Sequence, residues 1–240
     1  MSIDRQGRAE AWPAAQQGGG LDLTSDRAKV RRHPDRGHYD RQTIDAILDE
    51  ALVCHVSFVV EGEPRVLPTI PVRIENAIYL HGAPAAAMLA VISRGEPIAV
   101  CATLVDGLVL ARSVYNHSLN FRSVVVYGRG EEVVDHVEKM EVLRQLVEHV
   151  APGRSQEARM PNDKEIRATR VVKVHIEESA AKVRSGPPKD DQEDLDLPVW
   201  AGVLPFVPTW GDPIADDLLP RDVPLAASLA TDAPFAGARP

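Results

Sequence analysis

The chain has 240 residues, of which 44% are hydrophobic and 26% are charged, and its formal net charge is −8. This length suits one domain of about 150 residues with tails, and the apolar fraction is ordinary for a globular core. An acidic chain with scattered Lys and Arg residues is not typical of a protein that binds nucleic acid or anionic lipid. Because the sequence shows neither an apolar run of about 18 residues nor the apolar core of a signal peptide, we expect a cytoplasmic protein with no membrane span.

Residues 1–37 are polar and contain three consecutive glycines at 18–20 and a basic stretch from Arg27 to Arg36. This composition predicts a flexible N-terminal arm. The basic stretch has two interpretations. It is either a solvated segment, or a segment that reaches a partner subunit or an anionic ligand.

A helix and then a series of strands follow the arm. Asp40 can cap a helix over residues 41–51, and the apolar side chains of that helix have the spacing of one buried stripe, namely Ile44, Ile47, Leu48 and Ala51. The period then changes to two, which predicts strands at residues 53–60, 65–74 and 77–80. Since Pro68 and Pro71 cannot donate ladder hydrogen bonds, the strand at 65–74 must lie at an edge or be bulged near a ligand.

The centre of the chain predicts a second helix and a hairpin. Pro84 suits the first turn of a helix over residues 85–93. Strands at 98–104 and 108–114 are joined at Asp106-Gly107, which is a strong hairpin signal. The remaining elements are a polar loop, a strand, a helix with its capping pair and a last strand, at residues 115–120, 121–127, 135–150 and 169–177.

This order of elements predicts a mainly β (α+β) fold, because too few helices alternate with strands for a doubly wound sheet. We expect residues 38–185 to form an antiparallel, closed or partly closed barrel with peripheral helices. Ten of the 19 prolines lie in residues 186–240. That segment is interpreted as a Pro/Asp-rich extension, of which the apolar residues 197–205 dock on the domain and the rest is mobile.

Residues 110–128 contain the most informative motif, with Arg112, Asn116, His117 and Arg122 close together between two strands. A loop with so many hydrogen-bond donors suits a ligand with many acceptors. The alternative interpretation is a solvated hairpin loop.

This stretch, Leu-Ala-Arg-Ser at 110–113 and His-Ser-Leu-Asn-Phe-Arg-Ser-Val-Val at 117–125, resembles a signature of bacterial flavin proteins related to pyridoxamine-phosphate oxidase, which include nitroimidazole-resistance-type proteins. Other matching pieces occur in the same order, at residues 67–69, 78–83, 183–188 and 197–205. The resemblance covers roughly residues 31–205. It implies a six-stranded split β-barrel and a homodimer with an FMN site built from both subunits.

Carried over by position, the resemblance implies that three groups of residues line FMN, namely Leu67, Pro68 and Thr69; His81, Gly82 and Ala83; and Asn120, Phe121, Arg122 and Ser123. The planar fork of Arg122 suits the phosphate or the carbonyl acceptors of the flavin. His81 is a candidate proton donor or substrate contact, or it satisfies a backbone carbonyl. Trp200 covers a flavin edge or the dimer seam, or anchors the extension.

The sequence departs from the family pattern where the phosphate is expected. Related proteins carry a polar or basic pair there, whereas this chain has Ala85, Ala86 and Ala87. Backbone N–H groups at the helix start can still hold an anion, and Arg65, Arg73 or Arg94 can substitute for the missing charge. Otherwise the chain binds FMN weakly, binds another cofactor or has lost the cofactor.

The histidines and cysteines do not indicate a metal site. None of the histidines has a spacing typical of metal ligands. Cys54 and Cys101 both lie in apolar runs, so we expect reduced and buried thiols.

The resemblance therefore implies an FMN-binding oxidoreductase-like protein, in which flavin takes hydride from a reduced nicotinamide and passes electrons to a small organic substrate such as a nitroaromatic. Two alternatives are a non-enzymatic flavin or haem binder or sensor, and a homologue that has lost FMN and uses the cavity for other chemistry.

Overall fold

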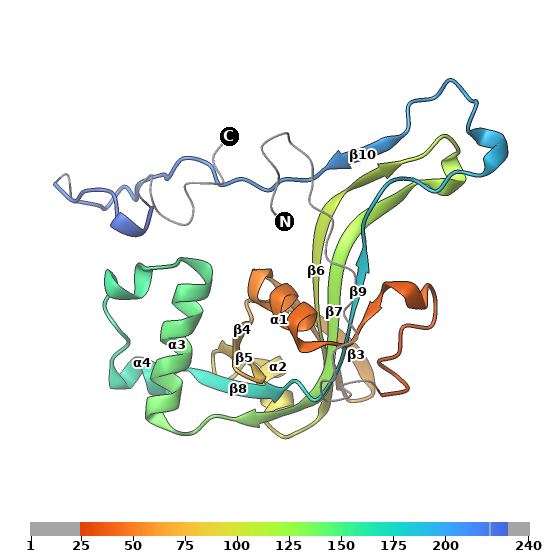
Figure 1. The fold of residues 1–240 in the computed structure, drawn as a ribbon. Coiled ribbons are helices and arrows are strands. Elements are labelled where there is room, and N and C mark those ends of the chain that lie inside the picture. The colour runs from red at the N-terminus through yellow and green to blue at the C-terminus, as the bar shows by residue number, and fades with distance from the viewer. Residues whose placement is uncertain (1–24, 221, 230–240) are drawn as a thin grey trace.

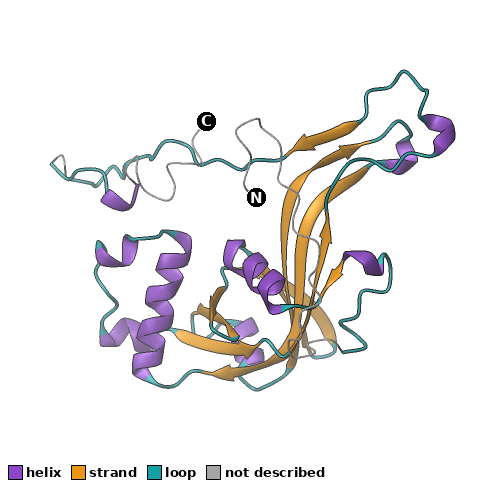
Figure 2. Cartoon of the chain, in the orientation of Figure 1, coloured by secondary structure: helices purple, strands orange, loops and turns teal. Residues whose placement is uncertain are grey.

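The computed structural model describes residues 25–220 and 222–229. Residues 1–24 of the expected arm and 230–240 of the expected extension lie outside this part of the chain. Figure 1 shows a body from which a long group of strands projects. Helices α1 to α4 lie in the body (Figure 1), and the projection consists of strands with short helical turns and loops at its tip (Figure 2). Within the described residues, no helix has the length and apolar character needed to cross a membrane.

The elements follow one another along the chain in a mixed order. The first part forms β1, α1, β2, β3, β4, β5 and α2, over Gly37–His38, Arg41–Glu50, Cys54–Val60, Glu63–Thr69, Val72–Ile74, Ala77–Gly82 and Ala87–Ile92. The second part forms β6, β7, α3, α4, β8, β9 and β10, over Pro97–Leu110, Ser118–Glu132, His136–Val150, Asp163–Arg167, Arg170–His175, Glu178–Arg184 and Gly202–Pro205.

The fold class predicted from the sequence is confirmed, since a mainly antiparallel sheet runs through the structure with helices at its periphery. Its strand order is β3-β2-β6-β7-β8-β5-β4, with β9 on β7, β1 on β9 and β10 on β6. Ten described strands join this sheet. The number exceeds the six of the expected barrel because the short strands β1 and β4, the strand β9 and the extension strand β10 also pair with it.

In the first part of the chain, the structure confirms the predicted cap of helix α1 and the predicted edge strand. Helix α1 begins where the Asp40 carboxylate accepts a hydrogen bond from the Thr43 amide at 2.8 Å. Strand β3 pairs with β2 and with no other described strand, which confirms the edge position predicted from Pro68. The predicted strand at 65–74 is, however, two strands, because the chain breaks at Ile70 and Pro71 between β3 and β4.

The predicted hairpin at Asp106-Gly107 is wrong. Strand β6 runs through this dipeptide without turning, and its register with β7 shifts between Val105 and Gly107, as at a β-bulge. Two tertiary contacts explain the bulge. The Asp106 carboxylate accepts hydrogen bonds from Arg122, and a Cβ atom on Gly107 would lie 2.7 Å from the Leu204 carbonyl of β10. The real turn between β6 and β7 lies at residues 111–117.

Strand β7 pairs with β9 along its first half and with β8 along its second half. The pairing with β9 runs from Phe121 to Tyr127, and the pairing with β8 runs from Gly130 to Glu132. Gly130 permits this path, because an added Cβ would lie 2.0 Å from Ile92 of α2. The sheet therefore splits into two branches that enclose the core.

The sequence analysis did not predict the two-residue strand β1, helix α4 or strand β9, and helix α2 begins later than expected. Helix α4 is only five residues long, although Asn162 and Glu165 form a capping box at its start. Strand β9 lacks a run of β-branched residues. Helix α2 begins at Ala87 rather than at residue 85, with no side-chain cap.

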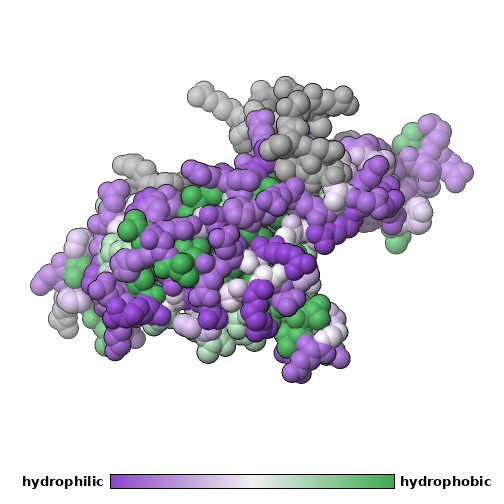
Figure 3. All heavy atoms as spheres, turned by 90° about the horizontal axis from the view of Figure 1, so that it is seen from below, coloured by the Kyte–Doolittle hydropathy of each residue, from purple (hydrophilic) through white to green (hydrophobic). Residues whose placement is uncertain are grey.

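The buried core has two parts, on opposite sides of the β4-β5-β8 branch. The larger lies inside the barrel and includes Ile44, Phe58, Leu80, Ile92, Val126 and Val174. The smaller lies beneath α3 and includes Val72, Tyr79, Val142 and Val171. Seen from below, the surface is mostly hydrophilic with a few apolar patches (Figure 3), as expected when burial of apolar area drives folding.

Both described ends of the chain contact the barrel. Arg27 donates to Glu178 at 2.7 Å and lies over the Tyr127 ring at 4.7 Å. Strand β10, from the apolar segment expected to dock, pairs with β6 from Gly202 to Pro205. Further on, the Ser228 amide and hydroxyl donate to the Glu157 carboxylate at 2.8 and 2.7 Å. The extension is thus attached at two described places.

The close approach at Gly107 gives a testable prediction. We expect Gly107→Ala to weaken the docking of β10, because its Cβ would meet the Leu204 carbonyl at 2.7 Å. The overpacking should lower the free energy of unfolding by about 1–3 kcal/mol. Limited proteolysis should cut the segment after β10 faster in the variant. Gly211→Ala is the matched control, because no atom lies within 4 Å of its added Cβ. Equal cleavage of the two variants would contradict the role assigned to Gly107.

Candidate functional site

Two of the three predicted groups of site residues meet at one corner of the barrel. Thr69 ends β3, and after the break at Pro71 the chain continues as β4, in which Val72 pairs with Tyr79 of β5. Because the pair is antiparallel, this register brings the end of β3 alongside the end of β5, where His81 and Gly82 lie. Leu67 is 44% exposed on the edge strand. The corner is therefore open on one side.

His81 is half-buried at this corner and is not engaged by the rest of the described protein. Its Nδ1 atom is buried and has no hydrogen-bond partner among the described residues. Burial lowers the pKa of its imidazole, so the ring is neutral at pH 7. A neutral imidazole with an available nitrogen can accept a proton or bind a metal ion.

The turn after His81 carries a cation that sequence reasoning missed. Arg170 pairs with Gly82 across β5 and β8, and its guanidinium donates to the Pro84 carbonyl at 2.8 Å and to Glu132 at 3.3 Å. Nothing in the sequence connects Arg170 with a turn 86 residues away. By contrast Arg73, one of the expected substitutes for the missing phosphate anchor, is held by Asp49 at 2.6 and 2.7 Å.

The signature residues on β7 divide between the two faces of the sheet. Val124 and Val126 face the core, so the alternation of a strand places Asn120 and Arg122 on the inner side, and Phe121 and Ser123 on the outer side. The row of paired residues Thr69, Cys54, Ala102 and Val124 crosses three strand spacings. The end of β3 at Thr69 and the signature residues on β7 are therefore about 14 Å apart.

Arg122 binds two carboxylates from other elements. Its guanidinium donates to Glu50 at the end of α1, at 2.8 Å, and to Asp106 at the β6 bulge, at 2.7 and 3.1 Å. Its side chain is 4% exposed, whereas that of Glu50 is 46% exposed. The carboxylates raise the pKa of Arg122, and the hydrogen bond from Arg122 lowers the pKa of Glu50. Arg122 and Glu50 are therefore charged at pH 7.

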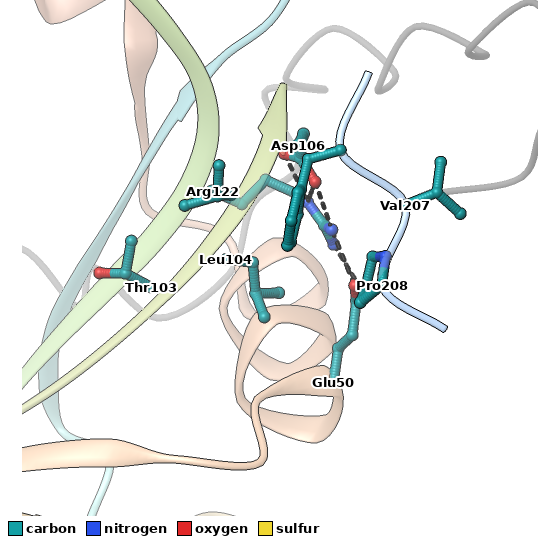
Figure 4. Close-up of a pocket in the computed structure, with 9 residues that line it drawn as sticks. Glu50, Thr103, Leu104, Asp106, Arg122, Val207 and Pro208 are labelled. Atoms are coloured by element: carbon teal, nitrogen blue, oxygen red, sulfur yellow. Dashed lines mark hydrogen bonds and ion pairs between the residues drawn. The ribbon is translucent and has the colours of Figure 1, made fainter. Parts of the chain in front are cut away.

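This ion cluster lies beside a hollow of about 470 Å³ (Figure 4). Phe206, Val207 and Pro208 of the extension form one wall, and Thr103, Leu104 and Val105 of β6 form another. The Phe206 amide donates to the Asp106 carbonyl at 3.0 Å. Arg122 thus holds together the walls of a hollow next to the signature strand. Its direct contact with a cofactor stays a prediction.

An apolar sheet surface, which we name the outer face, lies on the side of the barrel opposite the core. Its paired residues form cross-strand rows, including Pro68, His55, Cys101 and Val125, and Val66, Ser57, Ala99 and Tyr127. Val66 is 58% exposed and Val59 is 54% exposed. Cys101 is partly exposed there, so the expected burial holds only for Cys54. The outer face offers a surface for a flavin ring or a second subunit.

Two further candidates lie on the projecting strands. Trp200 is 67% exposed, and its ring packs against Gly202 at the start of β10. His117 has its Nδ1 atom 2.9 Å from the Ser113 carbonyl within the β6–β7 turn. The β6–β7 turn and the segment before β10, which carry these residues, lie on the projection, whereas β5, which carries His81, lies in the body (Figure 1).

Comparison with known proteins identifies the family. A sequence profile described as pyridoxamine 5'-phosphate oxidase matches residues 40–183. The chain belongs to the pyridoxamine 5'-phosphate oxidase family. This confirms the resemblance carried by the signature at 110–128. No curated protein sequence matches the chain.

Solved structures extend the comparison beyond the barrel. The flavocytochrome Anf3 from Azotobacter vinelandii is similar, with 38% identity and a TM-score of 0.81, over 88% of this chain and 97% of its own. An FAD- and haem-binding protein from Mycobacterium smegmatis has 30% identity and a TM-score of 0.77, over 80% of this chain and 95% of its own. A putative 5-nitroimidazole resistance protein from Bacteroides thetaiotaomicron has 26% identity and a TM-score of 0.49, over 61% and 86%.

The ion cluster gives a second prediction. Arg122→Ala leaves two carboxylates without their partner, so the free energy of unfolding at pH 7 should fall by about 3 kcal/mol. This loss of free energy is at the low end of the range expected for a broken buried ion pair, because Glu50 is 46% exposed. Since the folded-state pKa of Glu50 is depressed, its contribution is present above the unfolded pKa and is lost as the pH falls through the folded pKa.

Chemical denaturation between pH 7 and pH 3 measures both effects. As the pH falls, the free energy of unfolding of Arg122→Ala should decrease less than that of the wild type, because the variant lacks the pH-dependent contribution of Glu50. Arg129→Ala is the control, because Arg129 lies on the same strand but donates only to the Gly95 carbonyl in an exposed position. A variant as stable as this control at pH 7 would show that the cluster does not hold α1 to the sheet.

Proposed function

We propose that this protein binds a flavin and a haem and transfers electrons between them. The observation that carries the proposal is the likeness to a flavocytochrome at 38% identity over 88% of the chain. The family profile matches only residues 40–183, which are 144 of the 240 residues, or 60%. The likeness to the flavocytochrome therefore includes parts of the chain beyond the barrel, where family membership alone makes no prediction.

His81 fits the role of haem ligand in this proposal. Its Nδ1 atom is buried without a hydrogen-bond partner among the described residues, and burial keeps the ring neutral. A neutral imidazole nitrogen is a common axial ligand of haem iron. The role replaces the earlier suggestion of a proton donor. A haem held there supplies one-electron chemistry, and the flavin supplies the exchange between hydride and single electrons.

The flavin in this proposal is FAD, and FMN is the alternative. The relative from Mycobacterium smegmatis is named as binding FAD, whereas the family signature alone implies FMN. Ser123 offers a hydroxyl group on the outer side of β7, and the outer face offers apolar contacts for the ring. Acid extraction and chromatography of the purified protein identify the flavin.

Reduced nicotinamide is the proposed electron donor. The proposed electron acceptor is a small molecule bound to the haem iron. The alternative acceptor is a small organic substrate such as a nitroaromatic. The absorption spectrum of the purified protein is the first test, since flavin bands with a Soret band support the proposal and a colourless preparation contradicts it. Anaerobic addition of reduced nicotinamide should then bleach the flavin before the haem spectrum changes.

A third prediction concerns His81. We expect His81→Ala to abolish the Soret band while the flavin bands remain, because the substitution removes the iron ligand without altering the outer face. Spectra of purified protein reconstituted with excess haem measure the effect. His117→Ala is the control, because that ring contacts the Ser113 carbonyl on the projecting strands. An unchanged Soret band in His81→Ala, or its loss only in His117→Ala, would show that the ligand has been assigned wrongly.

We also propose that the protein is a homodimer that joins through the outer face. Exposed apolar side chains on three strands support this, with Val66, Val59 and Val105 exposed at 58%, 54% and 42%. Contiguous exposed apolar surface of this kind marks an interaction site, and two-fold dimers are the commonest soluble oligomers. The family resemblance implies the same arrangement.

The dimer proposal yields a fourth prediction. Val125→Glu places a charge in the middle of the outer face, so we expect monomers by light scattering at micromolar concentration, together with weaker flavin binding. Val137→Glu is the control, because Val137 lies on α3 and is 74% exposed. Wild-type protein that is itself monomeric would refute the proposal, as would a Val125→Glu variant that stays dimeric.

A further inference from the structure

A buried arginine lies where no described carboxylate balances it. Arg184 at the end of β9 is 7% exposed. Its guanidinium donates to the Asn120 side-chain carbonyl, and to the main-chain carbonyls of Gly186 and Pro187 at 3.4 Å each. Burial, and then the charge of Arg36, lower the pKa of Arg184. A buried charge without a counter-charge is costly, so this position suits an anionic ligand.

More cations surround Arg184. Lys182 lies two residues earlier on β9 and pairs with Gly37 of β1, which directly follows Arg36. Arg36 ends a short 3-10 helix that contacts β9. The register between β1 and β9 therefore brings the side chains of three basic residues to one corner of the sheet.

Three of the neighbouring cations also act on the imidazole of His33. Arg36 lowers the pKa of the His33 imidazole most, and Arg32 and Lys182 lower it further. Asp35 is the one described carboxylate that acts in the opposite direction. We name the set Arg32, Arg36, Lys182 and Arg184 the basic corner. The basic corner therefore concentrates positive charge in a chain whose net charge is −8.

The basic corner adjoins the signature strand. The Ser123 hydroxyl donates to the Lys182 carbonyl at 3.4 Å, and Asn120 accepts from Arg184. On the outer face, the row of paired residues from Pro68 to Ala180 crosses four strand spacings, or about 19 Å. An extended dinucleotide can cover this span with its ring at one end and its charged groups at the other, while a flavin ring alone is too short.

We propose that the basic corner binds the pyrophosphate of a dinucleotide cofactor. Arginine forks and a lysine make charge-assisted hydrogen bonds to phosphate oxygens. The corner would do what the basic pair missing at Ala85, Ala86 and Ala87 does in related proteins. The inference rests on the proposed function for the identity of the dinucleotide, which is either the flavin or the reduced nicotinamide.

Inorganic pyrophosphate is the first probe, titrated calorimetrically into the full chain freed of flavin. We expect Arg36→Gln and Lys182→Gln each to weaken binding about tenfold at low salt, the effect of one charge-assisted hydrogen bond. The loss should shrink at higher salt, where exposed charges are screened. Arg31→Gln is the matched control, because its side chain is 68% exposed and pairs with Asp26.

Titrations of the same variants with FAD, FMN, riboflavin and reduced nicotinamide identify the dinucleotide. A loss for FAD with no loss for riboflavin supports a flavin pyrophosphate, and a loss confined to the nicotinamide supports the electron donor. Equal losses for FAD and riboflavin overturn the proposal, as does wild-type protein that fails to bind pyrophosphate. Protein that binds pyrophosphate but takes up neither flavin nor haem would contradict the proposed function and leave the anion site standing.

Discussion

The buried guanidinium of Arg122 connects three parts of the fold that lie far apart in the sequence. It binds Glu50 at the end of α1 and Asp106 in the middle of β6, and its own strand is β7. The bulge that presents Asp106 also presents Gly107, against which β10 lies. Because a buried arginine must find partners for its donors, this side chain ties the end of the helix and the bulge to the signature strand, and the extension docks beside the bulge.

The positions of the outer face and of the corner at His81 both follow from the pairing of β7 with different strands along its length. Its first half pairs with β6 and β9, which makes the outer face continuous from the edge strand β3 to the basic corner. Its second half pairs with β8, which carries β5 and therefore His81. One long strand thus connects the corner assigned to haem with the surface assigned to flavin, and it does so within a single sheet.

Sequence patterns predicted the elements whose signals are local. The Asp40 cap, the edge strand with Pro68 and the change from helical to strand periodicity all depend on neighbouring residues, and all are present in the structure. The hairpin at Asp106-Gly107 failed for the opposite reason. The dipeptide permits a turn, but Arg122 and Leu204, from distant parts of the chain, make it a bulge.

Taken by itself, the sequence determined the family, the antiparallel fold class and the strand that carries the signature, since periodicity and motif are properties of adjacent residues. Only the tertiary structure decided which charges are balanced. It paired Arg122 with two carboxylates, left Arg184 among cations and carbonyls, and brought Arg170 to the turn after His81. These outcomes depend on strand register, because a shift of one residue reverses the face of every side chain, and register is decided by contacts between residues far apart in the chain.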